Sequence, residues 1–193
     1  GPAAAEVADR ALREGLLEGG VAAPLRGDGL RQRARGLAAA LHGRPRFLDE
    51  ELAFIARDRN PAAAVAHGWL RFGDKLPTLM HGSFALAVLE PLKKNAFLAL
   101  DRAGSERLCF ARHGGQLVFG SSAQGVAAHP AVGRNIDPQS IYDYLYFHTI
   151  PAPRSLYQGV QKLLPGQYAT LRNGQVRTGF YWQADYTPDD AGF

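Results

Sequence analysis

One run in the 193-residue chain constrains the fold most: Ser83 to Leu89, whose residues are apolar on both sides. In an extended strand, Phe84, Leu86 and Val88 would face one side, and alanine and leucine would face the other. A strand of this kind has to be covered on both faces. Because Ala96 to Asp101 has the same character, the sequence predicts sheets covered by other layers, which is an α+β sandwich.

The other predicted elements rest on caps and turns. Asn60 and Pro61 are a good N-cap and first residue for a helix that Gly73 can close. Asn173-Gly174 is a hairpin turn between two alternating strands. The remaining predictions are helices over residues 3–17, 49–57 and from 138 to 147, and strands over residues 107–111 and 116–120, which together with residues 83–101 suggest an antiparallel meander.

The helix that begins after Asp137 is unusually apolar. It carries Ile141 and Leu145 together with four aromatic residues, namely Tyr142, Tyr144, Tyr146 and Phe147. An amphipathic surface helix has one apolar stripe, whereas this helix is apolar around most of its circumference. We therefore expect it to be buried on more than one face, so that Tyr144→Ala with Phe147→Ala would lower stability.

Composition excludes several classes of protein. The single cysteine, Cys109, rules out an internal disulfide framework and favours a reducing, cytoplasmic location. No apolar run approaches the length of a membrane span, and the six histidines lack the spacing of a metal site, so we expect neither a membrane nor a metal. No P-loop, dinucleotide fingerprint or nucleophile elbow occurs, and Cys109 lies inside a predicted strand. No catalytic residue is assigned on these grounds.

An arginine-rich stretch lies near the N-terminal end of a chain whose formal net charge is +4. It lacks the interleaved aromatic residues of a nucleic-acid surface, so a solvated face is favoured and nucleic acid is not expected as a partner. A surface that meets an anionic partner stays open as an alternative. The arginines are Arg26, Arg31, Arg33, Arg35, Arg44 and Arg46.

Residues 73–182 carry an ordered series of motifs. The series comprises Gly73-Asp74-Lys75-Leu76 with His81 to Ala87, Leu98 to Gly104, Phe119 to Ser122, Ile150 to Tyr157, Lys162 to Gly166 and the closing Tyr181-Trp182. In this order the motifs resemble the second half of the glutaminase domain of asparagine synthetase B, a class II glutamine amidotransferase. The resemblance implies the four-layer αββα sandwich of the N-terminal nucleophile hydrolases, here abridged or altered at its N-terminal end.

The resemblance also implies a domain organisation. Residues 1–193 would form a single glutaminase-like domain with a divergent helical half (3–72), a family-like strand-rich half (73–182) and the start of a linker (183–193). In the family, an ATP-dependent synthetase domain follows in the same protein. We therefore expect no cofactor in this domain, ATP and Mg²⁺ in the synthetase domain, and leave a homodimer open.

Three positions depart from the family pattern that the resemblance implies. The family's nucleophile is an N-terminal cysteine, whereas this chain opens Gly1-Pro2-Ala3. His42-Gly43 stands where the family has the Asn-Gly pair of its oxyanion hole, and Arg44 follows where a Glu is usual. A gap-free count from Gly73 places Pro61 where an Asp holds the substrate α-amino group. We therefore expect a degenerate site, in which His42 and Gly43 mark a vestigial oxyanion-hole position.

These departures favour a non-catalytic domain that serves an asparagine-synthetase-related, amide-forming protein as a scaffold or docking surface. Two alternatives remain: an inactive fragment of a working glutamine-hydrolysing enzyme whose N-terminal cysteine was removed, and a stand-alone binding module using the arginine-rich surface. Asp101 and Arg102 are candidates for a pocket, or else form an ion pair that supports the Gly104 turn. The resemblance places the synthetase-domain interface at Tyr144, Phe147, Ile150, Pro151, Pro153 and Arg154.

Overall fold

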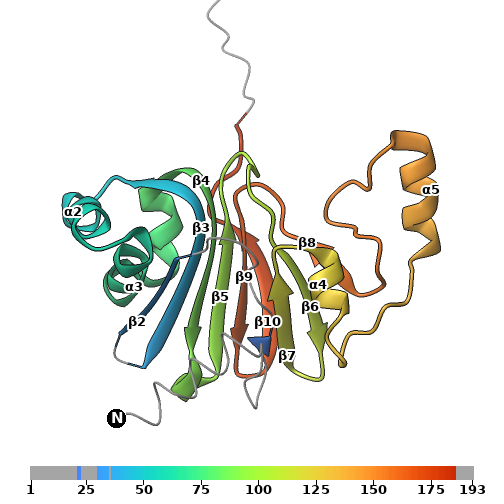
Figure 1. Cartoon of the computed structure of the whole chain (residues 1–193), viewed down its shortest axis with the longest axis horizontal. Helices are drawn as coiled ribbons and strands as arrows, with labels where there is room; N and C mark the ends of the chain where they lie inside the picture. Colours follow the sequence, from blue (N-terminus) through green and yellow to red (C-terminus); the bar gives the residue numbers. More distant parts are fainter. Residues whose placement is uncertain (1–20, 23–29, 35, 186–193) are drawn as a thin grey trace, which may run out of the picture.

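The computed structural model describes residues 21–22, 30–34 and 36–185. Two β-sheets lie at its centre, with helices on their outer sides (Figure 1). The predicted helix over residues 3–17, the N-terminal opening and most of the linker lie outside the described residues. In the described part of the chain, no helix is long and apolar enough to cross a bilayer.

The larger sheet has the strand order β10-β9-β5-β4-β3-β2, and its neighbouring strands are antiparallel. Its centre is the pair β3 and β4, which run side by side from Ala38 opposite Leu89 to Phe47 opposite Met80. The strands are β2 (Leu30–Ala34), β3 (Leu37–Phe47), β4 (Met80–Glu90), β5 (Asn95–Leu100), β9 (Gln167–Arg172) and β10 (Gln175–Phe180).

The smaller sheet has the order β1-β7-β6-β8. Its core is the β6–β7 hairpin, and β1 pairs with β7 in parallel. The strands are β1 (Val21–Ala22), β6 (Cys109–His113), β7 (Gln116–Gly120) and β8 (Val160–Lys162).

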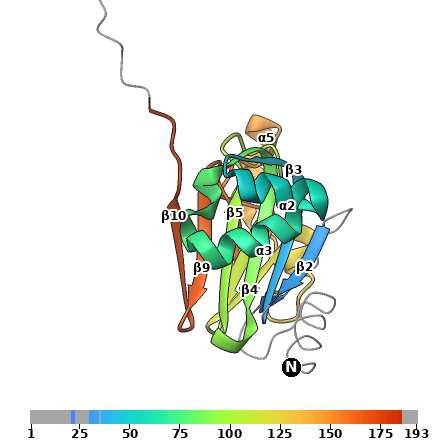
Figure 2. The same ribbon diagram turned by 90° about the vertical axis from the view of Figure 1, so that its left-hand side faces the viewer.

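Two capped helices cover the outer face of the larger sheet (Figure 2). In α2 (Glu50–Asp58), the Asp49 side chain accepts a hydrogen bond from the Leu52 amide. In α3 (Pro61–Phe72), Asn60 accepts from the Ala63 amide at 2.8 Å, and Gly73 closes the helix with a positive φ. The helix predicted over residues 49–57 and the helix predicted to begin at the Asn60 cap are both confirmed. Two 3₁₀ helices, η1 (Gly73–Leu79) and η2 (Pro91–Lys93), flank β4.

Three buried clusters define four layers. One cluster lies between the sheets and includes Ala85 and Leu98 of the larger sheet with Phe110 and Phe119 of the smaller. A second joins the larger sheet to α2 and α3, and a third joins the smaller sheet to α4 (Ala123–Ala127). The order helix, sheet, sheet, helix confirms the expected α+β class and αββα sandwich.

Two predictions about secondary structure are wrong. Residues 30–34 and 37–47, placed in a helical half, form β2 and β3. The strands from residue 80 to residue 120 do not form one meander, because β4 and β5 belong to the larger sheet while β6 and β7 belong to the smaller. The chain crosses between sheets in the loop that follows Asp101.

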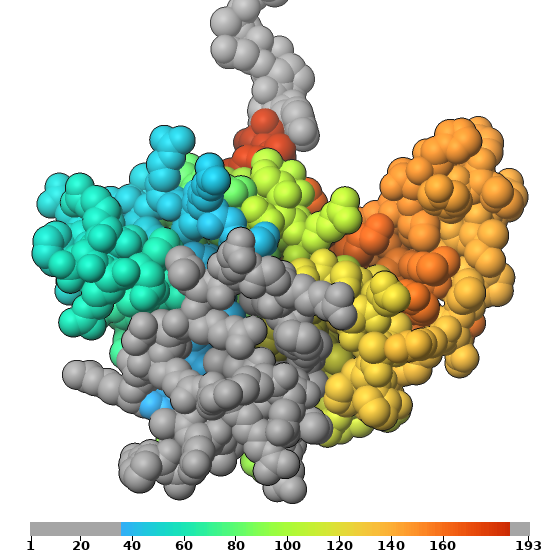
Figure 3. Space-filling model, viewed as in Figure 1, coloured from blue at the N-terminus to red at the C-terminus, as the bar shows by residue number. Residues whose placement is uncertain are grey.

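The burial predicted for the apolar helix is also wrong. This helix, α5 (Pro138–Phe147), stands away from the sandwich (Figures 1 and 3), and Ser140 is its only buried residue. Tyr144 and Phe147 are 56% and 55% exposed. Truncating them should therefore cost the described domain little stability, because burial is the main source of the penalty.

Candidate functional site

His42 and Gly43 lie in the second half of β3, where the strand continues past the inter-sheet core. His42 is opposite Ala85, and Gly43 is opposite Phe84. The His42 Nε2 atom lies 3.2 Å from the Glu106 Oε2 atom. Gly43 has φ +99°, and a Cβ atom there would meet the Ser83 carbonyl oxygen and the Glu106 carboxylate. The backbone at Gly43 therefore approaches its neighbours in a way that only glycine allows.

Asp101 is fully buried immediately after β5, and its carboxylate organises the loop that follows. Its Oδ1 atom accepts hydrogen bonds from the amides of Ala103 and Ser105, both at 3.0 Å. Its Oδ2 atom accepts from the amides of Phe84 at 3.3 Å and Glu106 at 3.1 Å. Four backbone donors thus satisfy the buried charge, which is the usual condition for keeping a carboxylate in an interior.

The structure brings His42, Gly43 and Asp101 to one end of the larger sheet. Asp101 holds the amide of Phe84, which pairs with Gly43, and it holds the amide of Glu106, whose carboxylate contacts His42. Sequence reasoning missed Glu106. Nothing in its local pattern marks it, because its partner lies 64 positions earlier in the chain and meets it only through the fold.

Arg102 does not join this group. Its Nη2 atom donates to the Thr78 carbonyl at 3.2 Å, and its guanidinium lies over the Trp182 ring. The described residues contain no Asp101–Arg102 ion pair, so that part of the prediction is wrong, although Asp101 does support the Gly104 turn. Arg102 instead helps to hold the segment that contains Tyr181 and Trp182.

Tyr181 packs against the same end of the larger sheet. Its hydroxyl donates to the Leu100 carbonyl at 2.7 Å, and its ring stacks on Phe84. Burial, with a smaller contribution from the negative Asp101, raises the pKa of Tyr181 well above its usual range. The phenol is therefore a neutral hydrogen-bond donor at physiological pH and holds residues 181–182 against the strand ends.

Cys109 is the single cysteine of the sequence, and it is buried at the start of β6. Burial raises the pKa of its thiol, and the positive charges of Lys162 and Arg107 reduce this shift only in part. A neutral buried thiol is a poor nucleophile, so Cys109 is part of the core, as predicted. Within the described residues, no group of three or more His, Cys, Asp or Glu side chains could hold a metal ion.

The predicted interface residues gather on α5 and the loop after it. Pro151, Pro153 and Arg154 line a hollow of about 510 Å³ between the two segments, and Ile150 accepts a hydrogen bond from Lys162. Arg154 connects the segments: its Nη1 and Nε atoms each lie 3.2 Å from a carboxylate oxygen, on Asp137 and Asp143 respectively. Tyr144 and Phe147 project from the same helix into solvent.

The contacts of Asp137 change the pKa of its carboxyl group. Desolvation acts to raise its pKa, but hydrogen bonds from Arg154, the Gln139 amide and Ser140 outweigh it, and the pKa lies below its ordinary value. Because the pKa of Asp137 is lower in the folded state, its charged carboxylate stabilises the fold at pH values above the ordinary aspartate pKa of ~3.9. This stabilisation is lost as the pH falls through the pKa of the folded state. At neutral pH the Arg154 contact is therefore fully formed.

Arg154→Ala should loosen α5 without unfolding the sandwich. The Arg154 side chain is about half exposed in both ion pairs, so the loss of the pairs should speed amide hydrogen exchange in α5 about fivefold and change global stability by less than about 0.5 kcal/mol. The measurement is residue-resolved hydrogen exchange. Arg134→Ala, at an exposed arginine without an ion pair in the described residues, is the matched control. Unchanged exchange in α5 would show that Arg154 does not hold the helix.

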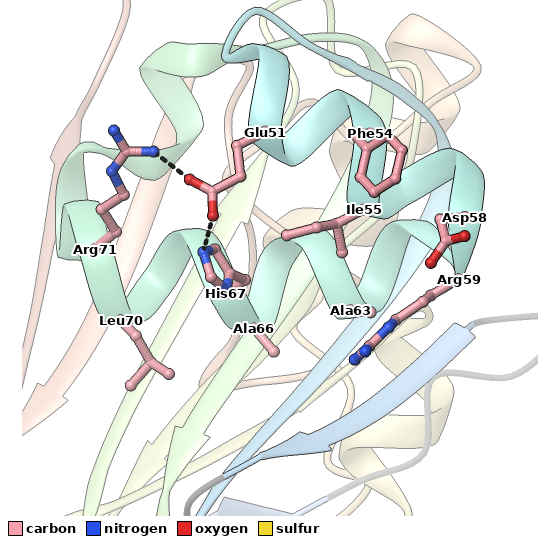
Figure 4. A pocket seen from close by; sticks show the side chains of 10 residues that line it. All are labelled: Glu51, Phe54, Ile55, Asp58, Arg59, Ala63, Ala66, His67, Leu70 and Arg71. Atoms are coloured by element: carbon pink, nitrogen blue, oxygen red, sulfur yellow. Dashed lines mark hydrogen bonds and ion pairs between the residues drawn. The ribbon is translucent and has the colours of Figure 1, made fainter.

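A second hollow lies on the outer face, between α2 and α3 (Figure 4). Glu51 accepts from Arg71 at 2.7 Å and contacts His67 at 3.0 Å, which ties the two helices together. None of the residues predicted for the site lines this hollow. Pro61 begins α3 on this side of the larger sheet, whereas His42 faces the other side, so the two are not brought together.

The described chain is therefore an αββα sandwich in which His42, Asp101 and Glu106 lie together at one end of the larger sheet. The chain belongs to the glutamine amidotransferase domain family, whose sequence profile matches residues 49–182. It is 21% identical over 122 residues to "Asparagine synthetase [glutamine-hydrolyzing] 3" of Bacillus subtilis, covering 63% of this chain and 20% of that protein. It is 26% identical over 113 residues to "Putative asparagine synthetase [glutamine-hydrolyzing] 2" of Methanocaldococcus jannaschii, covering 56% and 22%.

Among solved structures, the glutamine phosphoribosylpyrophosphate amidotransferase of B. subtilis aligns over 80% of this chain and 32% of its own, with 14% identity and a TM-score of 0.45. The chain thus spans about a fifth of the length of the curated relatives it matches. The family assignment confirms the resemblance seen in the motifs of residues 73–182.

Proposed function

We propose that this domain does not hydrolyse glutamine and serves as a docking scaffold for an ATP-dependent, amide-forming synthetase domain. The observation that carries the proposal is α5, whose large apolar side chains are exposed while polar contacts hold the helix in place. Isolated exposed apolar residues are ordinary, but so many large exposed apolar side chains on one short helix favour an interface. Because the chain spans only about a fifth of its relatives' length, a further domain of the same protein would be the partner of this surface.

The arrangement around His42 supports the absence of hydrolysis. An oxyanion hole needs donors that converge on one point where negative charge develops. The side-chain nitrogen of His42 contacts the Glu106 carboxylate instead. The negative charge of Glu106 would repel an oxyanion that formed nearby. The chemistry of the whole protein would then take place in the synthetase domain, which would hold ATP and Mg²⁺ in the cytoplasm.

The deciding experiment measures glutamate and ammonia together in the full-length natural protein supplied with glutamine. We expect no hydrolysis above background, while ammonia or another amine supports ATP turnover. Hydrolysis abolished by a thiol-blocking reagent would contradict the proposal and favour a working glutamine-dependent enzyme. Light scattering of the same sample gives the oligomeric state.

Leu145→Asp should separate docking from folding. Leu145 is 71% exposed, so we expect the melting temperature of the sandwich to move by less than about 2 °C, because no buried surface is lost. In the full-length protein, the charge would enter an apolar contact and make the junction after residue 185 more sensitive to proteolysis. The measurement is limited proteolysis together with thermal unfolding.

Leu92→Asp is the matched control, since Leu92 is 77% exposed in η2, far along the chain from α5. Equal protease sensitivity in both variants and in the unmodified protein would argue against α5 as the docking surface. Such a result would leave the glutamine assay unaffected, so the two parts of the proposal are tested separately.

A further inference from the structure

The second half of β3 presents its even-numbered residues on the face that points away from α2 and α3. Leu41 and Phe47 pack toward those helices, as do their cross-strand partners Leu86 and Met80. Ala38 and Ala40 instead lie in the core between the sheets. Because side chains alternate along a strand, His42, Arg44 and Arg46 lie on the same face as Ala38 and Ala40, which is the inter-sheet face of the larger sheet.

β4 adds two polar residues to the same face. Ser83 is directly opposite Arg44, and His81 is directly opposite Arg46. Opposed side chains on one face of an antiparallel pair lie about 5 Å apart at Cβ. The inter-sheet core of the described residues ends at Ala40 on β3 and Ala85 on β4, so this core does not extend over the shelf, and Arg44 and Arg46 are exposed. We call His42, Arg44, Arg46, His81 and Ser83 the strand-end shelf.

The positive charges of the shelf are largely unneutralised. Within the described residues, neither Arg44 nor Arg46 takes part in an ion pair. Of the acidic residues that the structure describes, Glu106 reaches the shelf, and its carboxylate contacts His42 at 3.2 Å. Arg71, Arg154 and Arg172 have carboxylate partners, whereas Arg57 and Arg59, like the shelf arginines, have none among the described residues.

We propose that the strand-end shelf binds a small-molecule oxyanion, a phosphate or carboxylate group, between Arg44 and Arg46. Planar guanidinium groups bind such anions with two parallel hydrogen bonds. Two residues apart on one strand, the two side chains start about 7 Å from each other, a spacing that one diphosphate or two carboxylates can bridge. The Ser83 hydroxyl and the His81 imidazole are further donor groups at the same place, whereas the His42 imidazole contacts Glu106.

A small anion fits the shelf better than a nucleic acid does. Proteins that bind single-stranded nucleic acids stack successive bases on aromatic side chains, and the shelf has no Phe, Tyr or Trp. Its charged row is also short, because it ends at Phe47, which turns toward the helices. This binding site does not depend on whether the domain hydrolyses glutamine or docks through α5.

The test is calorimetric titration of the full-length protein with pyrophosphate, inorganic phosphate and citrate at low salt. The variant Arg44→Gln with Arg46→Gln should weaken binding at least about tenfold, because charge-assisted hydrogen bonds are lost. Arg57→Gln with Arg59→Gln removes the same two charges from the exposed surface of α2 and its C-cap, and it should leave the affinity within about twofold. A preference for pyrophosphate over citrate would identify phosphate as the ligand chemistry, and the reverse would identify carboxylate.

Glu106→Gln gives a prediction of opposite sign. It removes the nearby negative charge while keeping a hydrogen-bonding side chain beside His42, so anion binding should strengthen about threefold or more. Thermal unfolding confirms that each variant is folded. No saturable binding of any of the three anions, or equal weakening by both arginine pairs, would overturn the proposal. Tighter binding of a single-stranded oligonucleotide than of pyrophosphate would overturn it as well.

Discussion

Asp101→Ala is expected to lower the free energy of unfolding by about 4 kcal/mol, which is a large fraction of the stability of an ordinary domain. The substitution removes the acceptor of four backbone hydrogen bonds, from Phe84, Ala103, Ser105 and Glu106. Each donor left without a partner in a buried or half-buried place costs about 1–3 kcal/mol, and some donors will find water. Urea unfolding measures the loss.

Two controls separate the hydrogen bonds from the charge. Asp101→Asn keeps one acceptor oxygen and should lose about half as much stability as alanine does. Asp74→Ala removes a carboxylate whose contact with Arg172 is about half exposed, and should cost less than about 1 kcal/mol. A loss below about 1 kcal/mol for Asp101→Ala would mean that the loop from residue 102 to residue 106 does not depend on this carboxylate.

Elements with strong local signals were predicted correctly. The caps at Asp49 and Asn60 determine where α2 and α3 begin, and the hairpin turn at Asn173-Gly174 lies where expected. The two-sided apolar pattern of residues 83–89 predicted a layered fold because only burial on both faces satisfies it. In each case, the residues that determine the element lie within the element or next to it.

β3 was missed because its local pattern resembles a helix. Residues 37–41 read Leu-Ala-Ala-Ala-Leu, and alanine has the highest helix propensity. In the structure these small side chains allow the larger sheet to pack closely on both sides. Tertiary packing therefore overrides propensity here, which a reading of one segment at a time cannot anticipate.

α5 shows the opposite error. Its apolar composition was interpreted as burial, but composition records how much apolar surface a helix has and not what covers it. The segment that follows, residues 148–161, holds α5 through Arg154 and through the Ser155 carbonyl, which accepts a hydrogen bond from Ser140. The aromatic side chains of α5 stay exposed. The docking partner that we propose for α5 would lie outside the described residues.

The candidate site was only partly predictable. His42 and Gly43 were selected through the family resemblance, and Asp101 through its place at a strand end. The contact that joins them, through Glu106, depends on a loop that crosses between the sheets. Arg102 was grouped with Asp101 because the two are adjacent in sequence, yet consecutive residues at a strand end point in different directions.

Gly43→Ala is expected to cost about 3–4 kcal/mol, because two penalties fall on one methyl group. At φ +99°, an L-residue is strained by about 1–2 kcal/mol. The added Cβ would also press against the Ser83 carbonyl oxygen, which belongs to the backbone of β4 and cannot rotate away. The central strands β3 and β4 would have to separate there, at a cost comparable to overpacking of a core.

Gly133→Ala isolates the first penalty, since Gly133 has φ +82° and nothing lies within 4 Å of its added Cβ. The difference in stability between the two variants, measured by urea unfolding, is the cost of separating β3 from β4 at this point. Because the same movement shifts Arg44 on β3 away from Ser83 on β4, Gly43→Ala should also weaken anion binding at the strand-end shelf, whereas Gly133→Ala should not. A Gly43→Ala variant as stable as Gly133→Ala would show that the close approach of the two strands is not required by the fold, and glycine at this position would then need a different explanation.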